Sequence, residues 1–246
     1  MRISRLPGIH HDADSVLIAD RGEVALINAG TSWYQLLSEE RIHGELRQDE
    51  KLGHLLLGCR RFNYAGGAAH LCESFAAEVH IHSEGVNALA IGDHFSTWAS
   101  RFDSDMPVIE ASALSDGQEI PVGRVSIKAV SLPGHCTDAM GFLIEERALL
   151  AAGPTLPLED HPSRWDMPTG CLPDLADSLE EMLDLELEML LPGQGPAIDG
   201  RERVQQILER HRDFFDVCIE DDGRMPEGWM KPSPTANYLS PLPKWS

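Results

Sequence analysis

Side chains that can bind anions or metals, or act as nucleophiles, gather directly after one short apolar run. Residues 58–64 read Gly-Cys-Arg-Arg-Phe-Asn-Tyr and follow Leu55–Leu57. A thiol such as Cys59 can serve as a nucleophile or a metal ligand. The guanidinium of Arg60 or Arg61 suits bidentate binding of a carboxylate or a phosphate. The paired glycines that follow favour a tight turn beside these side chains.

The elements that must position these residues can be placed from their apolar patterns. Short apolar runs predict strands, and apolar residues at helical spacing predict helices. The predicted strands span residues 16–19, 24–28, 54–57, 78–82, 118–122, 125–132, 141–145, 148–151 and 189–191. The predicted helices span residues 31–46, 65–75, 175–187 and 201–215. Three of the strand pairs read as hairpins, and hairpins combined with helices favour sheets packed face to face over one all-parallel sheet.

Charge and cysteine content narrow the classes of function. The chain of 246 residues carries 20 basic and 40 acidic side chains, a net charge of −20. Such a surface repels phosphate backbones and anionic membranes, so we expect no binding to nucleic acid or to membranes. Five cysteines without a Cys-x-x-Cys pair argue against a disulfide framework. Because no apolar run fits a signal peptide or a membrane span, we expect a cytoplasmic protein.

Four separated segments together resemble the metallo-β-lactamase-fold superfamily. Leu55–His70 matches the frame of its metal-binding signature, Leu-Leu-Thr-His-x-His-x-Asp-His-x-Gly-Gly, and Ser15–Gly30 ends where the family has Ile-Asp-Thr-Gly. Leu132–His135 stands where the family has Thr-Pro-Gly-His, and Leu190–Pro196 where it has Leu-Pro-Gly-His-Gly-Pro. The likeness is nearest to the hydroxyacylglutathione-hydrolase-like branch.

The resemblance implies an α/β fold of a defined kind. It is an αββα four-layer sandwich, in which two mixed β-sheets pack face to face with helices outside and an active cleft lies along one edge. We expect residues 1–223 to form this single domain. Residues 224–246 read as a Pro-rich C-terminal tail that is extended or poorly ordered. Active relatives often dimerise, so a homodimer is one possible assembly.

The resemblance also places the family's seven metal-ligand positions on this chain. They fall on Cys59, Arg61, Asn63, Tyr64, His135, Pro154 and Gln194. Only His135 keeps the family's residue, both acidic ligands are replaced, and Arg61 brings a positive charge with no lone pair to donate. We therefore expect no standard dinuclear metal site and no cofactor. The alternative is one zinc or iron ion held by Cys59 and His135.

Two further hypotheses concern what such a cleft does without two metals. In the first, Arg60 or Arg61, with Arg61 as the residue at the ligand position, holds a small anion. Its neighbours would be Asn63, Tyr64, His135 and Gln194. The competing interpretation is that one of Arg60 and Arg61 points to solvent while the other pairs with a carboxylate. In the second, the fold brings Cys59 and His135 together as a nucleophile–base pair.

Cys136 adjoins His135 in the sequence but is expected to face away from the pocket, because successive strand residues point to opposite faces.

A displaced metal site is a separate possibility. It would use residues 10–14, which read His-His-Asp-Ala-Asp, or His80 and His82, which share one strand face. Eleven histidines make chance clusters of this kind common.

The leading functional hypothesis is a binding or regulatory pseudoenzyme that does not hydrolyse the family's substrates. Its ligand would be a small anionic molecule or a protein partner. The alternative is a hydrolase of thioester, lactone or related ester bonds that uses a reduced or rearranged metal site.

Overall fold

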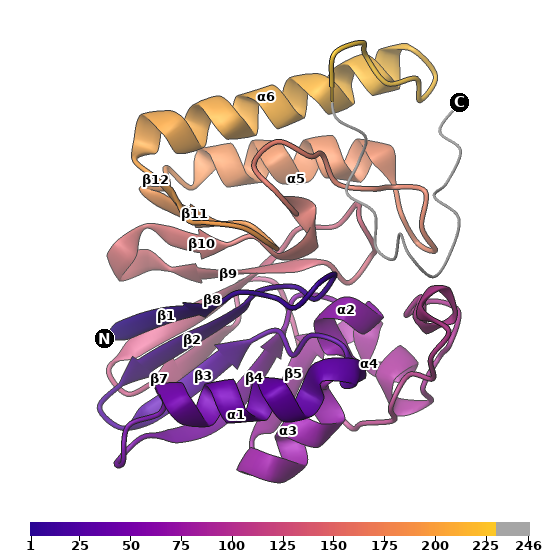
Figure 1. The fold of residues 1–246 in the computed structure, drawn as a ribbon. Coiled ribbons are helices and arrows are strands. Elements are labelled where there is room, and N and C mark those ends of the chain that lie inside the picture. Colours follow the sequence, from indigo (N-terminus) through magenta and orange to yellow (C-terminus); the bar gives the residue numbers. More distant parts are fainter. Residues whose placement is uncertain (230–246) are drawn as a thin grey trace.

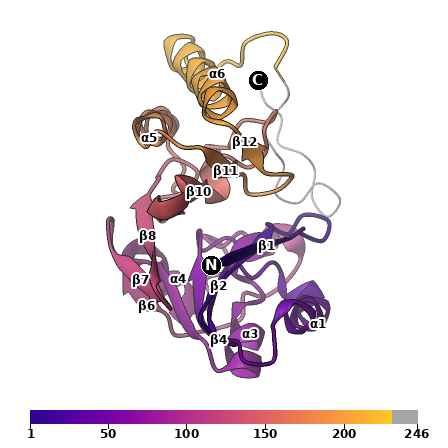
Figure 2. The same cartoon turned by 90° about the vertical axis from the view of Figure 1, so that its left-hand side faces the viewer.

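Two six-stranded sheets face each other, and helices cover their outer faces (Figures 1 and 2). The computed structural model describes residues 1–229. Strands between residues 2 and 114 build the first sheet, and strands between residues 119 and 199 build the second. The predicted αββα sandwich with two mixed sheets is confirmed.

The first sheet carries the segment that holds most of the chemistry-bearing residues. Its strands lie in chain order: β1 (Arg2–Leu6), β2 (Ser15–Asp20), β3 (Glu23–Ile27), β4 (Lys51–Leu57), β5 (Glu78–His82) and β6 (Ser112–Leu114). The first three strands pair antiparallel, whereas β3 to β6 pair parallel. The carboxyl ends of β4 and β5 therefore lie at the same edge of the sheet.

The second sheet is antiparallel except for one pair. Its order is β12 (Ile198–Asp199), β11 (Met189–Leu191), β10 (Leu149–Ala151), β9 (Met140–Ile144), β8 (Val125–Ser131) and β7 (Glu119–Val122). Only β10 and β11 run parallel. The loops after β8, β10 and β11 carry the remaining family motifs.

Each outer face is covered by amphipathic helices. The first sheet packs against α1 (Gln35–Glu45), α3 (Ala68–Phe75) and α4 (Ser83–Ala90), and the second against α5 (Leu172–Asp184) and α6 (Arg201–Glu220). Along α6 the residues Val204, Ile207, Leu208, His211 and Phe215 are buried, which is the i, i+3, i+4 spacing of one helix face. A short helix, α2 (Phe62–Ala65), follows the loop after β4.

Strand β4 is buried on both faces, as its continuous apolar run predicts. Leu55 and Leu57 pack in the core beneath the helices, whereas Leu56 points into the core between the two sheets. The same alternation places Phe142 of β9, which is fully buried, in the core between the sheets. This core fixes the spacing of the sheets and hence of the loops at their ends.

Some predicted boundaries differ from the structure. The apolar pattern did not predict β1, a half-buried strand at the sheet edge. The helix predicted over 65–75 begins only at Ala68, as α3, and the separate short helix α2 ends at Ala65, before Gly66 and Gly67. A Cβ on Gly67 would lie 2.5 Å from the carbonyl oxygen of Ala29, so the chain approaches the end of β3 too closely there for a side chain.

The first residues of the predicted tail contact the last helix. Trp229 packs on Phe214 with ring centroids 4.8 Å apart, and the Arg210 guanidinium lies 4.5 Å from the Trp229 ring centroid. The rest of the predicted Pro-rich tail, residues 230–246, lies outside the described residues. Across residues 1–229, no helix has both the length and the apolar character needed to cross a bilayer.

The core between the sheets gives a direct test of the fold. Phe142→Ala removes a fully buried ring and leaves a cavity, so we expect a loss of about 3–5 kcal/mol in the free energy of unfolding. The matched control is Phe95→Ala, because Phe95 is 70% exposed. Urea unfolding followed by circular dichroism measures both. Equal small losses in the two variants would contradict the assigned register.

Candidate functional site

The loops at the ends of β4, β8, β10 and β11 bring the seven predicted ligand positions together. We call the residues Cys59, Arg61, Asn63, Tyr64, His135, Pro154 and Gln194 the seven-position site. Hydrogen bonds hold the main chain beside these positions in place. Asn28, at the end of β3 with a φ of 62°, accepts the Gly58 N–H on its side-chain oxygen at 3.0 Å, and Met140 N–H donates to Gly58 O at 2.8 Å.

Cys59 lies in a small apolar cluster. It is fully buried with Ala13, Tyr64, Cys136 and Ala139 around it. Burial, together with a contact from Cys59, raises the pKa of the Cys136 thiol well above its usual value. The expectation that Cys136 faces away from the pocket is therefore wrong. Residues 133–139 form a loop after β8 rather than a strand, so strand alternation does not apply to them.

Arg60 is neutralised by a buried carboxylate. Its backbone N–H donates to one oxygen of Asp138 at 2.7 Å, and its Nε donates to the other at 2.8 Å. Asp138 is fully buried, and Thr137 accepts a further hydrogen bond from Arg60 at 3.0 Å. This ion pair ties the loop after β4 to the loop after β8. The interpretation in which one arginine pairs with an acid fits Arg60.

Arg61 is fully buried without a carboxylate partner among the described residues. Its guanidinium donates instead to three backbone carbonyls, those of Ser96, His135 (3.2 Å) and Pro168 (2.5 Å). Within residues 1–229 its Nε finds no acceptor. Arg61 thus neither points to solvent nor pairs with an acid, which neither interpretation of the two arginines foresaw.

The amides at two ligand positions bind the chain before β2. Asn63 Nδ2 donates to His11 O at 3.2 Å, and Gln194 Nε2 donates to Asp12 O at 2.7 Å. The backbone of this segment also bonds to the site, since Ala13 N–H donates to Asn63 O at 2.9 Å. Residues 11–14 therefore lie against the seven-position site and contact it through the main chain.

His135 is held in one tautomer by its neighbours. Ser163 Oγ donates its single hydrogen to Pro154 O at 2.7 Å, so it must accept from His135 Nδ1 at 3.2 Å. The lone pair of the ring then resides on Nε2. Burial, and the positive charges of Arg61 and Arg164, lower the pKa of His135 well below its usual value. The imidazole is therefore neutral at pH 7.

The residues present do not fit two divalent cations. Such a pair needs anionic carboxylates to neutralise it and about four donors for each metal. Here Arg61 contributes charge of the wrong sign, and the carbonyl of Pro154 already accepts from Ser163. Tyr64 is buried, and burial raises the pKa of its hydroxyl well above the usual value, so it stays protonated. Only Cys59, His135 and weak amide oxygens remain as donors.

One carboxylate beside the site is buried without full hydrogen bonding. Asp12 is 3% exposed, and within residues 1–229 its Oδ1 has no hydrogen-bond partner. Burial raises the pKa of Asp12 to about 6, and hydrogen bonding to Thr31 only partly offsets this rise. A Cβ on Gly30 would lie 2.7 Å from Asp12 Oδ2, which shows how closely the carboxyl group approaches the chain after β3.

A second group of possible metal ligands lies outside the seven-position site. Among the described residues, His54, Glu78 and His80 form the one group of three whose ligand atoms all lie within 4.8 Å of one another. The hypothesis made from the sequence paired His80 with His82 instead. His54 and His80 both lie in strands predicted from the sequence, but the pairing register that brings them together is not given by the sequence pattern.

Sequence comparison finds curated proteins that resemble part of this chain. A beta-lactamase-like protein 2 homolog of Caenorhabditis elegans is 27% identical over 125 residues, covering 49% of this chain and 41% of the relative. An atrochrysone carboxyl ACP thioesterase of Aspergillus fumigatus is 25% identical over 201 residues, covering 80% of this chain and 55% of the relative. The matches thus span about half the length of these relatives. No protein-family model matches the chain.

Solved structures decide the fold. A metallo-beta-lactamase family protein from Thermus thermophilus superposes with a TM-score of 0.70 at 22% identity, covering 89% of this chain and 81% of that one. The chain has the metallo-β-lactamase fold. A second neighbour, solved in a di-iron-bound form, superposes with a TM-score of 0.68 at 21% identity, covering 86% of this chain and 99% of that one. The likeness to the hydroxyacylglutathione-hydrolase-like branch stays a prediction.

Asp12 makes a testable contribution to the pH dependence of stability. Its pKa is raised on folding, so the folded state keeps a proton that the unfolded state loses between about pH 4 and 6. Stability from this group is therefore present at pH 4 and lost as the pH rises, by about 3 kcal/mol. Asp12→Asn removes this titration. Between pH 4 and pH 7 the free energy of unfolding of the variant should therefore rise by that amount relative to that of the natural chain.

Urea unfolding at several pH values measures this difference. Asp216→Asn is the control, because it changes a carboxylate on α6 that is 43% exposed. A difference between Asp12→Asn and the natural chain that stays constant from pH 4 to pH 7 would show that folding does not raise the pKa of Asp12.

Proposed function

We propose that this chain is a non-hydrolytic metallo-β-lactamase-fold protein that acts by binding, as a pseudoenzyme. The observation that carries the proposal is the apolar cluster around Cys59. Where the family holds metals, this chain packs Ala13, Cys59, Tyr64, Cys136 and Ala139 into a buried cluster. No carboxylate is among these residues, and the adjacent charge of Arg61 opposes a cation. Without a metal-activated water, the family's hydrolysis has no nucleophile at this place.

For the partner, we favour a protein surface over a small anion. Arg61, the expected anion binder, is fully buried, and both of its terminal nitrogens already donate to backbone carbonyls, so that within residues 1–229 only its Nε lacks an acceptor. By contrast, Ile91, Phe95 and Val108 are between 63% and 70% exposed. Large exposed apolar side chains are frequent at protein contact surfaces. Phe95 adjoins Ser96, whose carbonyl binds Arg61, so this segment is joined directly to the seven-position site.

One observation favours the second candidate, a hydrolase of thioester, lactone or related ester bonds. The thioesterase relative matches 80% of this chain, although at 25% identity. A metal site with fewer ligands than the family's would have to use His135 Nε2, which carries a lone pair, together with Cys59. This candidate requires a metal or an activated thiolate at a position that is buried and apolar.

Hydrolysis and metal content separate the two candidates. Protein purified without chelator should hydrolyse neither a simple acyl thioester nor a lactone above the buffer rate. Its metal content should not change in Cys59→Ala or His135→Ala, because an ion bound elsewhere on the chain would be kept in both variants. Hydrolysis lost in either variant, together with loss of a bound metal, would establish the hydrolase instead.

A small-anion probe tests the choice of partner. Inorganic phosphate should shift the melting temperature of the natural chain and of Arg61→Lys equally, because general salt stabilisation does not depend on one side chain. The lysine variant keeps the charge but loses the fork of donors that binds an oxyanion. Sodium chloride at matched ionic strength is the control. A shift found only in the natural chain would show that Arg61 binds the anion and would overturn the choice of a protein partner.

A further inference from the structure

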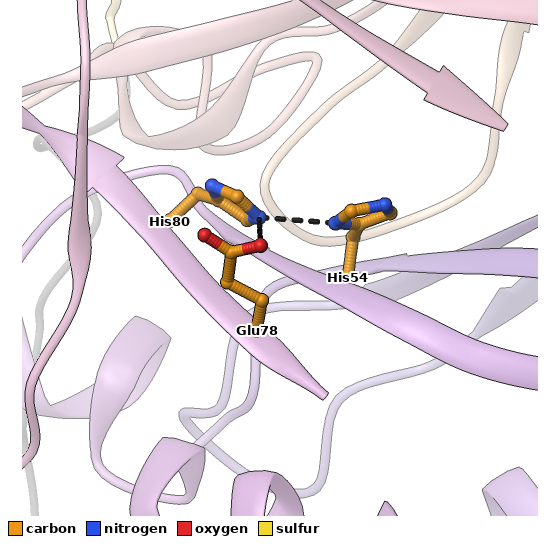
Figure 3. A group of neighbouring side chains, drawn as sticks. All are labelled: His54, Glu78 and His80. Carbon is orange, nitrogen blue, oxygen red and sulfur yellow. Dashed lines mark hydrogen bonds and ion pairs between the residues drawn. The ribbon is translucent and has the colours of Figure 1, made fainter. Parts of the chain in front are cut away.

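His54, Glu78 and His80 gather on one face of the first sheet, away from the seven-position site (Figure 3). Strands β4 and β5 are parallel neighbours in which His54 pairs with Glu78 and Leu56 with His80. Leu56 belongs to the core between the sheets, and residues two apart share a face, so His54 faces the same way. Val79 and Ile81 pack beneath the helices, which turns Glu78 and His80 toward the other sheet.

The two imidazoles present nitrogen atoms at a separation that one metal ion can bridge. His54 Nδ1 forms a hydrogen bond of 3.0 Å with His80 Nε2, so one of these nitrogens carries a proton, and that ring must move the proton to its other nitrogen before both can bind one ion. Two nitrogens each about 2.0–2.1 Å from a zinc ion lie that far apart when the angle at the metal is a little over 90°. Figure 3 shows both rings turned toward each other, with the Glu78 carboxylate beside them. A modest opening of the pair reaches the tetrahedral angle.

Glu78 completes a set of two imidazoles and one carboxylate. Its Oε2 lies 3.8 Å from His80 Nε2, and its Oε1 accepts a hydrogen bond from Ser112 Oγ at 2.7 Å. Ser112 belongs to β6 and pairs with His80, so the orienting hydroxyl comes from the next strand of the same sheet. His80 is 8% exposed whereas the Glu78 side chain is 57% exposed. The group therefore has one buried side and one open to water.

We propose that His54, Glu78 and His80 bind one divalent transition-metal ion, with zinc as the ion that best matches the donors. Two neutral imidazoles and a carboxylate suit zinc, and three protein ligands leave a fourth position for water. The Ser112 hydroxyl then holds the carboxylate in place, as outer-shell hydrogen bonds do in metal sites. His54 precedes the end of β4 at Leu57 by three residues, or about 10 Å, and Cys59 lies in the loop beyond that end, so the site is separate from the family's metal position.

His82 provides a matched control on the same strand. It also belongs to β5 and shares the face of His80, but its Nδ1 accepts the backbone N–H of Glu84 at 3.2 Å and caps α4. His82→Ala therefore removes an imidazole two residues away without touching the three proposed ligands. Any metal binding by scattered surface histidines would respond to His82→Ala and to the ligand variants alike.

Zinc titration by calorimetry tests the proposal on the full chain. The natural protein should bind one ion, and His54→Ala or His80→Ala should each weaken binding by more than the roughly 10–100-fold that outer-shell changes cost. Ser112→Ala should fall within that range, and His82→Ala should leave the affinity unchanged. Circular dichroism checks the fold of each variant, and His54→Gln replaces His80→Ala if the buried change unfolds the sheet.

The outcomes also separate this site from the seven-position site. No stoichiometric binding by the natural chain would overturn the proposal, as would an affinity unaffected by His54→Ala and His80→Ala. Binding that is lost in Cys59→Ala or His135→Ala but kept in His80→Ala would overturn the proposal as well, and it would place the ion at the family's position. Binding lost only in the strand variants supports the proposal and leaves the non-hydrolytic function of the seven-position site intact.

Discussion

The buried guanidinium of Arg61 is the constraint on which the rest of the site depends. Arginine cannot lose its charge by releasing a proton, so a buried arginine must find acceptors or destabilise the fold. Here the acceptors are the carbonyls of Ser96, His135 and Pro168, from three loops far apart in the sequence. One side chain therefore joins these three loops. The same charge helps to keep His135 neutral.

The loss of the dinuclear metal site that we propose has a simple energetic logic. A dinuclear site holds its loops together through ligand bonds, and removing the ligands alone would leave buried polar groups unsatisfied. In this chain the loops after β4 and β8 are joined by the buried pair of Arg60 and Asp138, and by the apolar contact of Cys59 with Cys136. The amides of the seven-position site keep polar roles by binding the segment before β2. Hydrogen bonds, one ion pair and close packing thus join the loops of the seven-position site.

The sequence predicted the fold because glycine and proline motifs at four loops report backbone geometry that does not depend on the metal. It also predicted that the ligand positions would meet. It did not predict their partners. Asp138 lies 78 residues after Arg60, and nothing local marks the pair. The predicted orientation of Cys136 was wrong, because the prediction used the alternation of side chains along a strand, whereas Cys136 lies in a loop. The contact of His54 with His80 depends on the register of two parallel strands, which periodicity alone does not give.

The two places in this fold that could hold a metal differ in how they are built. The seven-position site is assembled from loops, where single substitutions change the chemistry while the sheets keep their structure. The group on β4 and β5 stands on strands whose other faces are packed in the core, so its register cannot shift without exposing Leu55 and Leu57. Ligands on such strands are fixed in position by the hydrophobic core itself. A metallo-β-lactamase-fold chain can therefore lose the chemistry of its loops and still present a preorganised group of ligands on its central strands, because the two depend on different parts of the same scaffold.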